Sequence, residues 1–182
     1  HCTRLCHASS VAALLECVGS GAVSAPFTAT EDSDCAIVIG ARPTTNHPVA
    51  ATYIKQAAKK GTKVIIMDPR KNDMSRHAWE HLEFKPGMDV AMLNALIYTI
   101  IEEELYDKQY VQSMTNGFEE LKKSIEGFSP EEMSKKCGID ASTLRKVARV
   151  YANSERSIIF WGMGISQHVH GTDNARCLIT LS

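Results

Sequence analysis

Residues 35–70 read CAIVIGARPTTNHPVAATYIKQAAKKGTKVIIMDPR, and this stretch decides the fold class. Its two apolar runs, 35–39 and 63–67, lack the alternation of a half-buried strand and are typical of strands covered on both faces. Between them, residues 48–60 begin with Pro48 and stop at Gly61, which are the signals that open and close a helix. The stretch therefore predicts a strand, a helix and a second strand in one parallel sheet.

The same signals extend outward from this unit. Residues 157–161 predict another buried strand, and residues 81–85 predict a short one. The chain from 89 to 154 is mostly helical in pattern, and further helices are expected after a cap at Ser9 or Ser10 and from residue 174 onward. We therefore predict an α/β fold: a Rossmann-like parallel sheet flanked by helices, with a helical insertion before the last strand, as a single domain spanning residues 1–182.

Composition excludes several classes of function. The formal net charge of -1, with no long basic run, gives no bulk attraction for nucleic acid or an acidic membrane surface. The longest apolar stretch, 90–101, is interrupted by Asn94 and is too short to predict a membrane span. Most of the six cysteines lie in apolar periodic segments, which favours thiols in a reducing compartment and hence a cytoplasmic location.

Neither end of the chain has the pattern of a natural terminus. There is no initiator methionine, and the helix expected from residue 174 runs to Ser182 without a capping signal. We therefore expect the chain to be one piece of a longer polypeptide, and any site in it to be partial.

The strand ends carry the first candidate site. Asp68 ends the second strand of the opening unit, 28 residues beyond Gly40, where an acidic residue in a doubly wound fold can hold a ribose hydroxyl. The loop GARPTTNHP at 40–48 is not the GxGxxG pattern, so Asp68 could equally well simply close its strand. Gly162 and Gly164 follow the strand at 157–161, where they would suit either a ligand close to the backbone or a tight turn.

The first residues carry the second candidate site, Cys2, Cys6 and His7. A zinc half-site lacks suitably spaced partners elsewhere in the chain, and a nucleophile activated by the adjacent residue requires two neighbours that commonly point apart. Cys6 precedes a helix N-terminus, whose dipole favours a thiolate able to bind a soft metal. A buried structural cysteine explains the residue equally well, so both readings stay open on this pattern.

The ordered set of motifs resembles one known family. It consists of CTRLCHASSVAALLECVGSGAVS at 2–24, GARPTTNHPVA at 40–50, VIIMDPRKNDMSRHA at 64–78, KPGMDVAMLNAL at 85–96, IIEEELYD at 100–107 and IIFWGMGISQHVHG at 158–171. Together these resemble the catalytic subunits of molybdenum- or tungsten-dependent formate dehydrogenases, in the dimethyl sulfoxide reductase superfamily. Each motif is modest alone, but their order is specific and covers essentially the whole chain.

The resemblance implies a metal carried by two molybdopterin guanine dinucleotides, with Cys6 as its protein ligand in place of a selenocysteine and His7 as the active-site histidine that handles protons. It implies cofactor contacts at Arg42, Thr45, Asp68, Arg70, Gly87, Asp89, Gly162, Met163 and Gln167. Arg42 and Thr45 depart from the asparagine and aspartate of some members. A guanine dinucleotide bound without a GxGxxG loop would account for Asp68 and the glycines at the strand ends.

The implied reaction is oxidation of formate to carbon dioxide. The resemblance places an iron–sulfur cluster upstream of His1 and a formate-orienting arginine downstream of Ser182, so the isolated chain should be inactive. Expected partners are formate, other domains of the same chain and iron–sulfur or flavin electron-transfer subunits. Two alternatives remain: a domain of another molybdopterin oxidoreductase, such as a nitrate reductase, and a non-catalytic scaffold relative. The sequence decides neither molybdenum against tungsten nor the electron acceptor.

Overall fold

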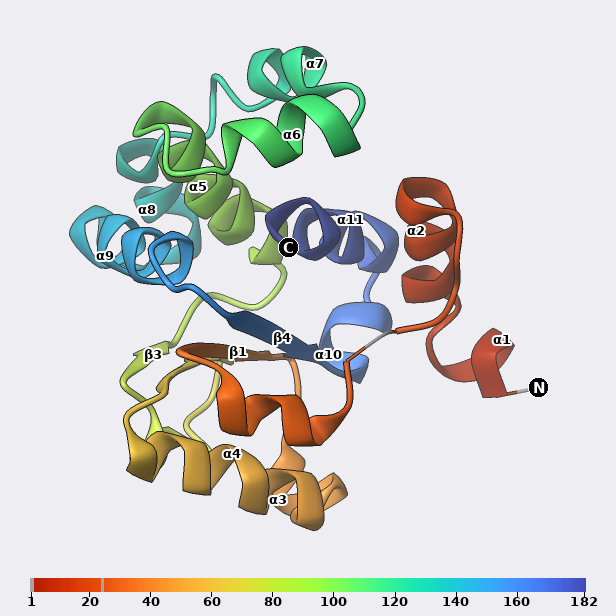
Figure 1. Ribbon diagram of the computed structural model, residues 1–182, viewed down its shortest axis with the longest axis vertical. Coiled ribbons are helices and arrows are strands. Elements are labelled where there is room, and N and C mark those ends of the chain that lie inside the picture. Colours follow the sequence, from red (N-terminus) through yellow and green to blue (C-terminus); the bar gives the residue numbers. More distant parts are fainter. Residues whose placement is uncertain (1, 24) are drawn as a thin grey trace.

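A four-stranded parallel sheet organises the molecule (Figure 1). The computed structural model describes residues 2–23 and 25–182, with Cys2 described by its backbone alone. The strands lie in the order β3-β2-β1-β4, with bounds β1 Cys35–Ile39, β2 Lys63–Met67, β3 Glu80–Leu82 and β4 Ser157–Trp161. Ile37 in β1 pairs with Ile65 on one side and with Ile159 on the other. The predicted α/β class with a parallel sheet is confirmed.

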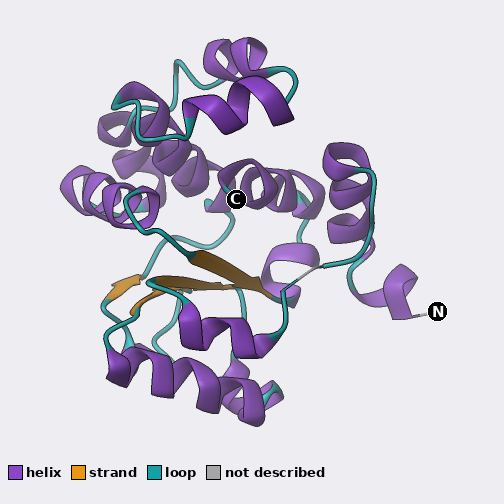
Figure 2. Ribbon diagram, viewed as in Figure 1, coloured by secondary structure: helices purple, strands orange, loops and turns teal. Residues whose placement is uncertain are grey.

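Helices cover both faces of the sheet, which explains the continuous apolar runs of its central strands (Figure 2). All five residues of β1 are at most 1% exposed, because successive side chains point to opposite faces and both faces are covered. Ala36 and Val38 face the side of α4 (Pro48–Lys60), where Ile54 packs. Ile37 and Ile39 face the larger cluster built by the helices of the opposite layer.

The remaining elements are helices, and the short ones at 2–6, 27–32, 43–46, 75–77 and 163–166 were not predicted. They are α1 Cys2–Cys6, α2 Ala8–Val18, η1 Phe27–Asp32, α3 Pro43–Asn46, η2 Ser75–His77, α5 Asp89–Glu102, α6 Lys108–Met114, α7 Phe118–Ser124, α8 Pro130–Cys137, α9 Ala141–Ala152, α10 Met163–Ser166 and α11 Gly171–Leu181. The stretch α5 to α9 is the predicted helical insertion, inserted between β3 and β4. Within the described residues, each helix falls short of the length and hydropathy needed to cross a bilayer.

Three local predictions need correction. The short strand is β3 at 80–82 rather than 81–85, because the chain turns away beyond Leu82 and the Lys85 backbone N–H donates to the Cys137 carbonyl at 2.8 Å. The loop after β1 contains the short helix α3, which no signal in the sequence indicated. Ser9 and Ser10 do not cap a helix but lie inside α2, and their hydroxyl groups bond elsewhere.

Candidate active site

The loops that follow the four strands meet along one border of the sheet, because parallel strands all end on the same side. We call residues 40–47, 68–74, 83–89 and 162–170 the sheet edge. The strand order puts β2 on one side of β1 and β4 on the other. The loops after β1 and β4 therefore diverge at a switch point, where doubly wound folds bind their ligands.

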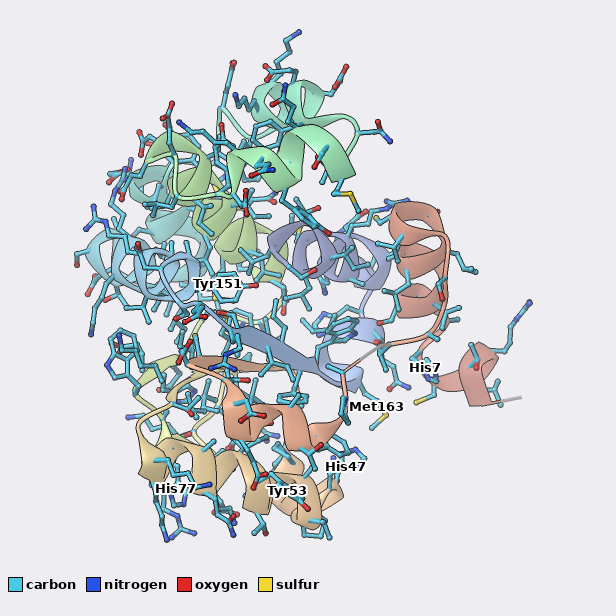
Figure 3. The ribbon with its side chains drawn as sticks, viewed as in Figure 1. His7, His47, Tyr53, His77, Tyr151 and Met163 are labelled. Atoms are coloured by element: carbon cyan, nitrogen blue, oxygen red, sulfur yellow. The ribbon has the colours of Figure 1, made fainter. Side chains whose placement is uncertain are left out.

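The opening segment of the chain lies against the β4 part of the sheet edge. Cys6 ends α1 and His7 precedes α2, and both are half-buried. The Gln167 side-chain amide Nε2 donates to the carbonyl of Cys6 at 3.3 Å, which links residues 161 positions apart. Figure 3 shows His7 and Met163 on the same side of the molecule, beyond the end of the sheet. Three predicted site residues, Cys6, His7 and Gln167, are thus neighbours.

The glycines beside β1 and β4 are required by the backbone itself. Gly40 has a φ of +56°, and a Cβ at that position would lie 2.8 Å from the backbone carbonyl carbon of Gly164. A Cβ on Gly164 would lie 2.7 Å from Gly40, and one on Gly162 would lie 2.9 Å from the Gly40 carbonyl oxygen. The tight-turn explanation is therefore sufficient for all three, and a ligand contact at Gly162 stays a prediction.

The β1 and β2 parts of the sheet edge present charged groups to solvent. The Asp68 carboxylate accepts from the Arg70 backbone N–H at 2.8 Å, which holds the turn after β2. Arg42 is exposed and lies 3.8 Å from Asp73, a contact too long and too open to fix its guanidinium. Thr45 and the side chain of Arg70 are also exposed. These predicted contact residues share one border, where Asp68 and Arg70 are joined by that backbone hydrogen bond.

A cavity of about 310 Å³ lies where the β3 and β4 parts of the sheet edge approach each other, lined by Gly87, Asp89, His168, Val169, His170 and Asn174. Asp89 begins α5 and is only 4% exposed. Burial raises the pKa of its carboxyl, while its own backbone N–H and the charge of His168 oppose that shift. Gly87 and Asp89 thus face a space shared with the loop after β4, as their predicted role requires.

Three buried polar side-chain atoms have no hydrogen-bond partner among the described residues: Thr44 Oγ1, Asn72 Nδ2 and His81 Nδ1. Thr44 and Asn72 follow β1 and β2, and His81 lies in β3, where its Nε2 meets the Asp68 carbonyl at 3.1 Å. Since the Asp68 carbonyl can only accept, Nε2 carries a proton, and Nδ1 is left without a partner. Buried polar atoms of this kind are uncommon and fit a polar ligand at the sheet edge.

Sequence reasoning missed Asn72 and His81, together with a polar network around Ser10. The Nε2 of His81 is hydrogen-bonded, as is ordinary for a histidine, whereas its Nδ1 is not. Ser10 looked like a helix cap. No signal in the sequence could have separated these roles, because a single residue type serves caps, turns and long-range bonds alike.

The described side chains do not support a zinc site at the opening segment. No group of three or more His, Cys, Asp or Glu residues in the described part of the chain is arranged to hold a metal ion. The side chain of Cys2 lies outside the described residues. The described cysteines are all free thiols, as predicted: Cys6, Cys17, Cys35, Cys137 and Cys177. Cys6 would therefore meet a metal as a single protein ligand, with other donors coming from elsewhere.

Comparison with known proteins gives a consistent result. The family described as molybdopterin oxidoreductase matches residues 1–182. Formate dehydrogenase H of Escherichia coli is 41% identical over 181 residues, which is 100% of this chain and 25% of that protein. The F420-dependent formate dehydrogenase subunit alpha of Methanocaldococcus jannaschii is 38% identical over 182 residues, 100% of this chain and 27% of that protein. The chain spans about a quarter of the length of these relatives.

A solved structure has the same architecture. Acetylene hydratase from Pelobacter acetylenicus superposes with a TM-score of 0.80 at 29% identity, covering 94% of this chain and 23% of that one. This neighbour is named as a hydratase and not as a formate dehydrogenase. A shared fold therefore does not by itself determine which reaction a protein catalyses.

Proposed function

The chain belongs to the molybdopterin oxidoreductase family, and from that premise we propose that it is one cofactor-binding domain of a formate dehydrogenase catalytic subunit. The domain spans residues 1–182 of a longer polypeptide. The observation that carries the proposal is the hydrogen bond between Gln167 and the Cys6 carbonyl, which holds the candidate metal ligand beside the switch point of the sheet. Formate dehydrogenases among the relatives that match the full chain support the choice of substrate.

The residues at the sheet edge fit a molybdopterin guanine dinucleotide. The unpartnered Thr44 Oγ1, Asn72 Nδ2 and His81 Nδ1 and the buried Asp89 offer the mixed donors and acceptors that a polar nucleotide needs. In this proposal the dinucleotide is held by Arg42, Thr45, Asp68, Arg70, Gly87, Asp89, Gly162, Met163 and Gln167. The Cys6 thiolate is a soft ligand suited to molybdenum or tungsten. When bound, the metal centre supplies a two-electron acceptor.

In the proposed reaction, formate becomes carbon dioxide and gives up two electrons and one proton. His7 follows Cys6 directly, and an imidazole can accept and release a proton near neutral pH. It is half-buried and stands directly before α2. The electrons would leave through an iron–sulfur cluster elsewhere in the polypeptide, toward iron–sulfur or flavin subunits. Free thiols throughout the described residues support a cytoplasmic location.

Two other functions compete with this one. A nitrate reductase of the same family would share the fold, and the direct Cys6–His7 succession favours formate over it. A non-catalytic scaffold relative would have no use for a thiol at the switch point, so the presence of Cys6 there disfavours that reading.

The test is to express the full-length polypeptide with Cys6→Ser and with Cys17→Ser as a matched control, because Cys17 is an exposed thiol on α2. We expect Cys6→Ser to lower formate oxidation about a hundredfold or more and to deplete bound metal, since losing even an outer-shell partner of a metal ligand costs roughly 10–100-fold. Elemental analysis measures molybdenum and tungsten. Undiminished turnover in Cys6→Ser would contradict the ligand assignment, and nitrate reduction without formate oxidation would favour the sister enzyme.

The isolated 182-residue chain gives a second test. It lacks the expected iron–sulfur cluster and formate-orienting arginine, so we expect no formate turnover and little bound metal. Robust turnover by this chain would refute the idea that the site is partial.

A further inference from the structure

A buried polar network joins the start of α2 to the end of β4 and to α10. The Trp161 indole Nε1 donates to Ser10 Oγ at 3.0 Å, and the hydroxyl groups of Ser10 and Ser166 lie 2.6 Å apart. The Ser9 hydroxyl donates to the Ser166 carbonyl at 2.5 Å. These bonds span more than 150 residues of sequence, and Ser10 and Ser166 are 4% and 8% exposed.

The donors and acceptors of the network are consistent with one another. An indole N–H can only donate, so Ser10 Oγ accepts from Trp161 and keeps its own proton for Ser166 Oγ. Removing one member would leave a buried polar atom without a partner, which costs more than the bond itself contributes. Gly171 packs closely against this network, since a Cβ at that position would lie 2.9 Å from Ser9 Oγ.

Helix capping and apolar packing do not account for these serines. Neither hydroxyl caps α2. Farther along α2, Leu15 and Val18 are 53% and 60% exposed, and in α1 Leu5 is 80% exposed. Apolar burial holds the inner face of α2, where Ala13 is fully buried, but it leaves α1 largely exposed, whereas the serine bonds tie the first turn of α2 directly to the loop after β4.

From this geometry we propose that Ser10, Ser166 and Trp161 are positioning residues that set the place of Cys6 at the switch point. Cys6 lies four residues before Ser10, at the end of α1, and its carbonyl is held by Gln167, one residue beyond Ser166. The network and the Gln167 bond thus fix the opening segment and the loop after β4 as one unit. The catalytic consequence rests on the proposed function, whereas the position of the Cys6 thiol can be measured without it.

The first experiment measures thiol alkylation in metal-free, full-length protein, resolved by peptide mass spectrometry. Ser10→Ala and Trp161→Phe each remove one partner and preserve most of the packing. We expect each to raise the rate at which iodoacetamide alkylates Cys6, relative to Cys17, by about fivefold. Losing one net hydrogen bond, worth about 1 kcal/mol, raises the equilibrium constant for local opening by that factor. Thr99→Val is the control, because Thr99 is fully buried and donates within α5 to the Ala95 carbonyl, far from α2 in sequence.

The second experiment uses the metal-loaded enzyme. We expect Ser10→Ala to lower kcat for formate about tenfold with KM nearly unchanged, since misplacing a reacting group affects the chemical step. The double variant Ser10→Ala with Ser166→Ala should cost less than the sum of the single changes, because the two hydroxyl groups share one bond. A loss of thermal stability without a change in the rate ratio would mark a merely structural role.

An unchanged Cys6-to-Cys17 ratio in both variants, or an equal rise in Thr99→Val, overturns the proposal. Full metal loading of Cys6→Ser would instead overturn the ligand assignment on its own, whatever the alkylation ratios are. The two hypotheses can therefore fail separately.

Discussion

The sheet edge and the helical insertion α5–α9 satisfy their polar groups in different ways. In the insertion, Arg145 donates to both carboxylate oxygens of Glu131, at 3.0 and 3.1 Å, and to Glu102 at 2.7 Å. Arg149 likewise donates to both carboxylate oxygens of Glu103. At the sheet edge, by contrast, buried polar atoms of Thr44 and Asn72 lack partners, as does one of His81 in the adjoining strand β3. The insertion pairs most of these charged groups among its own helices, although Lys146 pairs with Glu80 of β3, whereas the three buried atoms near the strand ends are left without a partner among the described residues.

Apolar exposure does not follow the same contrast. Leu93, Met133 and Leu144 in the insertion are at most 1% exposed, but Tyr110 and Met114 in α6 of the same insertion are 58% and 68% exposed. Around the loop after β4, Met163 and Val169 are 49% and 97% exposed. Single exposed apolar side chains are ordinary, so the two regions differ in how their polar groups are paired rather than in apolar exposure.

The largest expected effect comes from Gly40→Ala at the sheet edge. The positive φ costs about 1–2 kcal/mol for a residue with a Cβ. The clash with the Gly164 backbone adds about 1–3 kcal/mol of overpacking, because backbone atoms cannot move aside. We expect urea unfolding of the 182-residue chain to report a loss of about 3 kcal/mol or more.

Gly138→Ala in the insertion is the matched control for that change. Gly138 also has a positive φ, of +80°, but its Cβ would meet only the flexible side chain of Lys85 at 3.3 Å. The Gly138→Ala variant should therefore lose about 1 kcal/mol of unfolding free energy, which is the cost of the left-handed conformation alone. Equal losses at Gly40 and Gly138 would remove the distinction between a rigid edge and an adaptable insertion.

A smaller effect is expected from Gly171→Ala, where α11 begins. Its Cβ would collide with the Ser166 carbonyl oxygen and lie 2.9 Å from Ser9 Oγ, so the polar network must shift. We expect about 2 kcal/mol of destabilisation in urea, within the usual range for overpacking. The Cys6 alkylation rate should also rise. Gly127→Ala is the control, because a Cβ there would have nothing within 4 Å, and its free energy of unfolding should stay within about 0.5 kcal/mol of the parent. A loss at Gly127 as large as that at Gly171 would contradict the steric explanation.

Much of the fold could be predicted from local pattern, because its central strands are buried on both faces. The ranges 35–39, 63–67 and 157–161 coincide with β1, β2 and β4 to the residue. Ser129 caps α8 by accepting from the Glu132 backbone N–H, whereas Asp140 stands at the N-cap of α9 without a side-chain bond. The strand β3 was misplaced because it is only three residues long and two of them, Glu80 and His81, are polar, so the sequence around it carries a weaker signal than the apolar runs do.

The candidate site could be predicted only in part. Asp68 and Gly162 stand at strand ends, so topology alone brings them to one border. The position of Cys6 depends on bonds between residues more than 150 apart, and no local pattern encodes them. Ser10 shows the limit best. A serine at a helix start is most simply a cap, and only the tertiary structure reveals that its hydroxyl serves β4 and α10 instead.

The smallest expected effect is that of Arg145→Met in the insertion. The hydrogen bond from Arg145 lowers the pKa of Glu131, and that from Arg149 lowers the pKa of Glu103. A carboxylate whose pKa is lowered by folding stabilises the protein above its unfolded pKa, about 4.3 for Glu, and loses that contribution as the pH falls through the lowered value. At pH 7 and low salt we expect Arg145→Met to cost about 1 kcal/mol, as exposed ion pairs do.

That cost should shrink in acid and in high salt, because protonation removes the partner charges and salt screens those that remain. Urea unfolding of the parent and Arg145→Met at pH 7 and pH 3 measures it. The Cys6-to-Cys17 alkylation ratio should be the same in both proteins, since Arg145 bonds to carboxylates of the insertion itself. If Arg145→Met altered Cys6 reactivity, the two regions would be coupled rather than independent.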